Sequence, residues 1–81
     1  MQVDKLIGLL VERSGLSDRR VSLDLGKCET WARNTKKNAK DPRIGTVADV
    51  ADVAGCDVCI IDRETGAVVA TVTPPRRVQE G

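Results

Sequence analysis

Hydrophobic positions recur at the helical spacing of three and four residues in two well-separated parts of the chain. Residues 3–13 are expected to form an amphipathic helix with apolar side chains at Val3, Leu6, Ile7 and Leu10. The pattern returns in a later helix, with apolar side chains at Val47, Val50, Ala51 and Ala54. Thr46 and Asp49 resemble the capping box that starts a helix, and Gly55 is suited to end it.

Two shorter helical segments lie between these helices, on either side of a glycine turn. Ser17 is a good N-cap for the first, which turns at Gly26, and the second is expected over residues 29–37. Ser22 and Ala32 are small, so the two helix axes can approach each other closely. Two short helices that cross steeply through such a turn are typical of a helix-turn-helix, whose second helix can enter a DNA major groove.

After Gly55 the pattern changes to the short apolar runs of β-strands. Residues 57–61 and 67–73 are rich in β-branched side chains and flank a loop ending at Gly66, which predicts a hairpin. Both faces of the strands are apolar, and the short helices are expected to cover only one. Because a lone hairpin is marginal in water, the other face is expected to meet a second copy of the chain. The expected dimer interface comprises Cys59, Ile61, Val69 and Thr71.

The predicted fold class is mostly α with a C-terminal β-hairpin, a four-helix domain containing a helix-turn-helix. We divide the chain into a DNA-binding domain over residues 1–55, a hairpin dimerisation element over 56–75 and a flexible tail over 76–81. The chain has 81 residues and a single aromatic side chain, Trp31. Its small core must therefore be built from Val, Leu, Ile and Ala.

The net charge is only +1, but the charges are unevenly distributed. Basic side chains concentrate between residues 19 and 43, whereas acidic ones follow between 49 and 64. A polarised surface suits a protein that docks one face on phosphates. The candidate phosphate-binding residues are Arg19, Arg20, Lys27, Lys36 and Lys37. The candidate base-reading residues are Arg33 for guanine, Asn34 for adenine, Thr30 for a thymine methyl group and Glu29 for cytosine.

Other chemistry is poorly represented in the sequence. The chain has no histidine, so a serine or cysteine nucleophile lacks its usual base, and we predict no enzymatic activity and no cofactor. Cys56 and Cys59 have the spacing of zinc and redox sites, but zinc needs four ligands and only Cys28 remains. We therefore expect no metal. The absence of a long apolar run favours a cytoplasmic protein without a membrane partner.

Residues 3–62 resemble the Cro and repressor (XRE-like) helix-turn-helix family of phages and bacteria. The likeness is carried by Val-Ser-Leu-Asp-Leu-Gly-Lys at 21–27 and by Asp-Pro-Arg-Ile-Gly-Thr-Val-Ala-Asp-Val-Ala-Asp-Val-Ala-Gly at 41–55. Cys28 departs from the family, which has a Ser or Thr cap there, and Ala32 is smaller than the usual Val or Ile. The resemblance implies a recognition helix that exposes Cys28, Glu29, Thr30, Arg33, Asn34 and Lys37.

These features predict a sequence-specific transcriptional regulator, a repressor that binds a palindromic operator in double-stranded DNA as a homodimer. Two alternatives remain open. In one, a small phage or mobile-element protein uses the same scaffold to bind and inhibit another protein. In the other, the chain is the DNA-binding antitoxin of a toxin–antitoxin pair and holds the toxin with its hairpin or tail. The near-neutral charge and the presence of Glu29 on the reading helix keep the first alternative, a protein partner, open.

Overall fold

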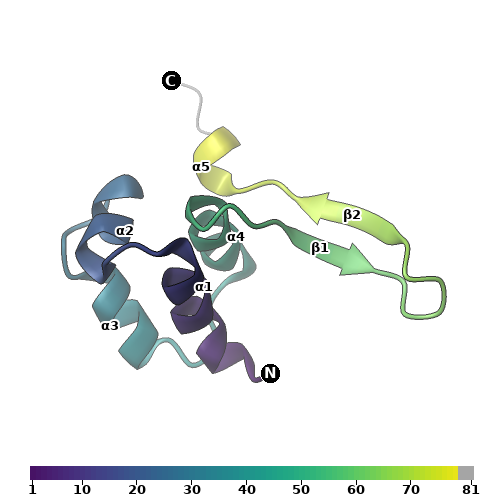
Figure 1. Ribbon diagram of the computed structural model, residues 1–81, viewed down its shortest axis with the longest axis horizontal. Helices are drawn as coiled ribbons and strands as arrows, with labels where there is room; N and C mark the ends of the chain where they lie inside the picture. Colours follow the sequence, from purple (N-terminus) through teal and green to yellow (C-terminus); the bar gives the residue numbers. More distant parts are fainter. Residues whose placement is uncertain (79–81) are drawn as a thin grey trace.

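The computed structural model describes residues 1–78, which form short helices and one two-stranded sheet (Figure 1). The 3-10 turn η1 (Val3–Lys5) leads into α1 (Leu6–Ser14), followed by α2 (Asp18–Asp24), α3 (Trp31–Asn38) and α4 (Ile44–Val53). Strands β1 (Val58–Ile61) and β2 (Val68–Val72) pair in antiparallel fashion, and α5 (Pro75–Val78) ends the described part. The predicted mostly α class with a C-terminal hairpin is confirmed.

The hydrophobic core lies among α1, α2, α3 and α4. Its buried side chains are all aliphatic, as the composition requires: Ile7, Leu10, Val11, Val21, Ala32, Val47, Val50 and Ala51. Trp31 and Leu25 are partly buried and pack against the edge of this cluster. Ile7 and Leu10 are buried as the helical periodicity predicted, and so are Val47, Val50 and Ala51, whereas Val3 is exposed in the 3-10 turn.

The starts of three helices differ from expectation. Helix α1 begins at Leu6, after the 3-10 turn, rather than at residue 3. Helix α4 begins at Ile44 with extended Arg43 as its N-cap, so Thr46 is already helical and the expected capping box is wrong. A Cβ on Gly45 would lie 3.0 Å from Cγ of Pro75, so α5 packs directly on this first turn. Helix α3 begins at Trp31, later than expected, and has no side-chain cap. Ser17, by contrast, caps α2 as predicted by accepting from the Arg20 amide at 3.1 Å.

The hairpin projects from the helices as an arm (Figure 1). Its inner end packs on the core through Val58, but both faces of its outer part are exposed. Ile60 is 51% exposed on one face, and Ile61 is 59% exposed on the other. The expectation that the helices cover one face of the sheet is therefore wrong, because the arm points away from them.

The strand register contains a bulge that alternation along the sequence did not reveal. Cys59 lies opposite Thr71, and Ile61 lies opposite Val68. Val69 is the extra residue in β2. Of the four residues expected at the dimer interface, Cys59, Ile61 and Thr71 therefore share one face of the hairpin, and Val68 rather than Val69 lies opposite Ile61.

The stretch expected to be a flexible tail begins as the short helix α5. Asp49 accepts a hydrogen bond from the Arg76 amide at 3.0 Å, and Asp52 forms ion pairs with both Arg76 and Arg77. The Asp52 side chain is only 10% exposed. Two carboxylates of α4 thus hold residues 76 and 77, whereas residues 79–81 lie outside the described part of the chain.

Candidate nucleic-acid interface

Helices α2 and α3 are fixed to each other by a buried serine. The Ser22 hydroxyl donates to the Asp18 carbonyl oxygen at 2.7 Å and accepts from the Ala32 amide at 2.8 Å. Gly26 has φ of +71° in the turn between the helices, a conformation that favours glycine. Ser22 and Ala32 are both fully buried, so small side chains do bring the two helices together as the sequence predicted.

One face of α3 and the turn before it presents polar side chains to solvent. Arg33, Asn34 and Lys37 are exposed and Thr30 is half-buried. Their spacing of three and four residues places these four on one side of the helix. Among residues 1–78, Arg33 and Lys37 form no ion pair and the Asn34 side chain forms no hydrogen bond. We call Thr30, Arg33, Asn34 and Lys37 the α3 stripe.

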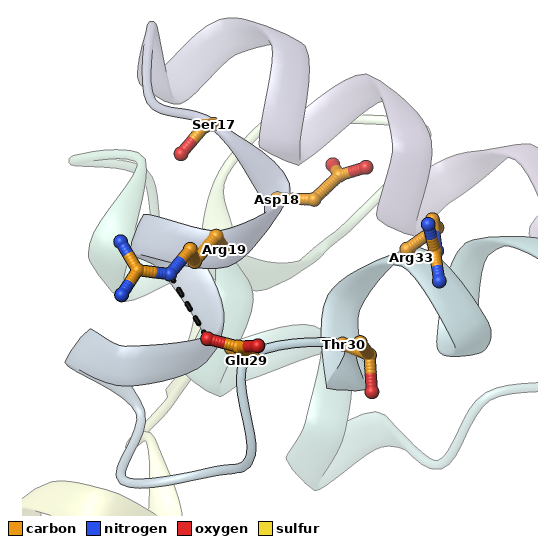
Figure 2. A pocket seen from close by; sticks show the side chains of 6 residues that line it. All are labelled: Ser17, Asp18, Arg19, Glu29, Thr30 and Arg33. Carbon is orange, nitrogen blue, oxygen red and sulfur yellow. Dashed lines mark hydrogen bonds and ion pairs between the residues drawn. The ribbon is translucent and has the colours of Figure 1, made fainter.

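Glu29 lies beside the α3 stripe but is paired with α2. Its Oε2 atom is 3.1 Å from Nε of Arg19, and the two side chains are 62% and 70% exposed (Figure 2). Arg19, Glu29, Thr30 and Arg33 line one hollow between the start of α2 and α3, together with Ser17 and Asp18. An exposed ion pair of this kind stabilises a fold by only about 0.2–1 kcal/mol. Arg19 can therefore leave Glu29 and bind another anionic group.

Three further basic side chains form ion pairs or a cation–π contact with other side chains of the same chain. Arg20 pairs with Asp24 at 3.2 Å, and Nζ of Lys36 lies 2.7 Å from Asp18. The ammonium group of Lys27 lies 5.9 Å from the centre of the Trp31 ring. Of the five expected phosphate-binding residues, Lys37 alone has no such contact within residues 1–78.

The stem of Lys36 crosses α1 at a glycine. A Cβ built on Gly8 would lie 3.8 Å from Cδ of Lys36, so the side chain passes over this position to reach Asp18. The Lys36 side chain is 34% exposed, the least of the basic side chains on α2 and α3 that form ion pairs. Lys36 therefore acts mainly as a link between α3 and α2.

A second hollow is lined by lysines that the sequence did not indicate to be neighbours. Lys5 and Lys40 line it together with Lys36 and Lys37, and Asp4 is the acidic residue at its edge. Lys5 belongs to η1, far from α3 in the sequence, and only the packing of α1 on α3 brings it there. Lys5 and Lys40 extend the positive potential beyond the end of the α3 stripe.

The cysteines lie in different environments. A hydrogen bond with the Thr30 hydroxyl, at 3.7 Å, lowers the pKa of the Cys28 thiol below its ordinary value. Sγ of Cys56 donates to the Ala54 carbonyl oxygen, whereas Sγ of Cys59 lies beside Thr71 Oγ1. Across residues 1–78, no three Cys, His, Asp or Glu side chains are grouped as metal ligands would be.

No protein-family model matches the chain, and no curated protein or solved structure matches it either. In the described part of the chain, no helix combines the length and hydrophobicity needed to cross a membrane.

Proposed function

We propose that this protein is a sequence-specific DNA-binding regulator in which α2 and α3 act as a helix-turn-helix of the Cro and repressor type. Two copies joined through the hairpin bind a palindromic operator and repress transcription. The observation that carries this proposal is the α3 stripe. Arg33, Asn34 and Lys37 are exposed on one helix face, and their side chains form no ion pair or hydrogen bond within residues 1–78, whereas half-buried Thr30 contacts Cys28.

The chemistry of the α3 stripe suits the edges of base pairs in a major groove. Arg33 can donate two hydrogen bonds to guanine, Asn34 can make a bidentate contact with adenine, and Thr30 can contact a thymine methyl group. Lys37 stands at the end of the stripe, next to Lys5 and Lys40 in the second hollow, where it suits the phosphate backbone. Glu29 is assigned to holding Arg19 rather than to reading cytosine.

One observation favours a second candidate function. Arg19, Arg20 and Lys36 are each paired with a carboxylate, so the surface around the α3 stripe is more nearly neutral than the sequence alone suggests. A balanced surface and an exposed apolar arm also suit a protein that binds another protein, as an inhibitor or antitoxin does. Duplex binding separates the regulator from an inhibitor that binds protein alone, whereas a DNA-binding antitoxin would bind the duplex as well.

The direct test of the proposal is a titration of the purified protein with a mixed-sequence DNA duplex at several salt concentrations. Each phosphate contact should contribute about 0.9 to the slope of log K against log salt. We expect binding at low salt that weakens steeply as salt rises. Absence of binding at low salt, or binding indifferent to salt, would contradict a DNA-binding role.

A further inference from the structure

The two open edges of the hairpin differ in their capacity to pair with another strand. In β2, the extra residue Val69 interrupts the row of main-chain groups, and Pro74 and Pro75 follow one residue after the end of the strand. Bulges and prolines are devices that block strand addition at an edge. Strand β1 (Val58–Ile61) has no proline, no charged side chain and no extra residue. The edge of β1 is therefore the one suited to pairing.

The main-chain groups available at that edge follow from the hydrogen bonds at the end of the hairpin. The Asp62 amide donates to the Ala67 carbonyl oxygen at 2.9 Å, so it points across the hairpin. Main-chain groups alternate in direction along an antiparallel strand. The N–H and C=O groups of Cys59 and Ile61 therefore point away from β2, toward the open edge.

We propose that two copies of the chain pair through their β1 edges, antiparallel about a two-fold axis at Ile60. The product is a continuous four-stranded sheet in the order β2, β1, β1, β2. This inference rests on the proposed homodimer and specifies its interface. Cys59 and Ile61 of one copy exchange main-chain hydrogen bonds with Ile61 of the partner subunit and Cys59 of the partner subunit.

The absence of charge along the hairpin strands and the limits of β1 favour a second copy in this register. Near a two-fold axis a charged side chain would meet its own copy, and β1 and β2 carry none. With the axis at Ile60, both outward-facing residues of β1, Cys59 and Ile61, pair with residues inside the strand of the second copy. A shift by two residues would pair one of them with a residue outside the strand, either Asp57 or Arg63, which lies in the turn of the hairpin.

Disulfide trapping tests the edge and the register together. The native cysteines Cys28, Cys56 and Cys59 are first replaced by Ser. Ile60→Cys then places a thiol beside its own copy in a non-hydrogen-bonded pair, with Cα atoms about 4.5 Å apart, a separation that a disulfide can span. Ala70→Cys is the matched control, because Ala70 lies opposite Ile60 on β2. We expect mild oxidation to convert Ile60→Cys, and not Ala70→Cys, into a covalent dimer on a non-reducing gel.

A proline pair provides an independent test by light scattering. Cys59→Pro removes an N–H from the open edge of β1, whereas Thr71→Pro alters the residue opposite it on β2. We expect Cys59→Pro to raise the dimer dissociation constant at least tenfold and Thr71→Pro to leave the dimer intact.

Three results would overturn the pairing: a parent protein that stays monomeric at high micromolar concentration, trapping through Ala70→Cys instead, or a dimer that neither variant traps. The DNA titration separates this inference from the proposed function. A monomer that binds DNA overturns the pairing and the dimeric mode alone. A disulfide-trapped dimer that does not bind DNA would contradict the proposed regulatory function and support the proposed interface.

Discussion

Ser22 shows how much one side chain can determine in a small domain. Its side chain is polar and fully buried, and its hydroxyl donates to the Asp18 carbonyl oxygen within α2 and accepts from the Ala32 amide of α3. The Ala32 amide lies in the first turn of α3, where it has no partner within the helix. Ser22 therefore satisfies a buried donor and sets the position of α3 at the same time.

Ser22→Ala should lower the free energy of unfolding by about 1–3 kcal/mol, because the buried Ala32 amide loses its acceptor. Urea denaturation measures the change. Ser14→Ala is the control, since Ser14 contacts only Val11 and Leu16 at the end of α1, and we expect a cost of about 0.5 kcal/mol or less. Equal costs for the two variants would show that the link between the helices is not important for stability.

Arg33 is the side chain of the α3 stripe with the greatest capacity to discriminate between bases. Arg33→Ala should remove about 1–3 kcal/mol of discrimination per half-site, or about 2–6 kcal/mol for a two-fold dimer. Stability should barely change, because Arg33 is exposed and alanine is a good helix former. Competition between a preferred and a scrambled duplex measures the effect, with Arg13→Ala, at the exposed end of α1, as the matched control. Full retention of preference in Arg33→Ala would place base reading elsewhere.

At the scale of elements, the helices and the hairpin could be predicted because each has a clear period of apolar positions. Their boundaries depend on contacts that no local pattern contains. Pro75 packs on Gly45 in the first turn of α4, and Asp52 of α4 pairs with two arginines of α5. The bulge at Val69 likewise changes the register without interrupting the run of apolar residues.

The candidate site could also be predicted only in part. The resemblance to the helix-turn-helix family implied that Thr30, Arg33, Asn34 and Lys37 are exposed, and Arg33, Asn34 and Lys37 are. The ion pairs of Arg19 and Lys36 were not predictable, because their carboxylate partners belong to neighbouring segments that only the tertiary fold brings close. The contribution of Lys5 was missed for the same reason.

Lys36 and Lys37 are adjacent in α3 but should behave differently. Lys37→Ala should reduce the slope of log K against log salt by about 0.9 for each phosphate that is no longer neutralised, and it should weaken binding to all duplexes similarly. Lys36→Ala should leave that slope unchanged and lower stability slightly, by up to about 1 kcal/mol, because Lys36 is paired with Asp18. Titrations at several salt concentrations and urea denaturation measure both effects. A reversed pattern would show that Lys36 contacts DNA and that its ion pair is dispensable.

At the scale of the whole molecule, the two proposed surfaces lie far apart. The hairpin arm and the α2–α3 pair are on opposite sides of the helical body in a chain whose longest extent is 41 Å (Figure 1). Pairing through β1 therefore leaves both α3 helices free and directs them away from the shared sheet. Their separation should match half-sites whose centres are one helical turn of DNA apart, about 34 Å, or a multiple of it.

Selection of bound sequences from a pool of random duplexes tests the central claim most directly, because it requires DNA binding, base reading and two-fold symmetry together. The account predicts enrichment of a palindrome whose half-sites are separated by a whole number of helical turns. Specific binding should exceed binding to scrambled duplexes by at least about 10³-fold. Failure to enrich any sequence at low salt would contradict the account and favour a protein partner for the same surfaces.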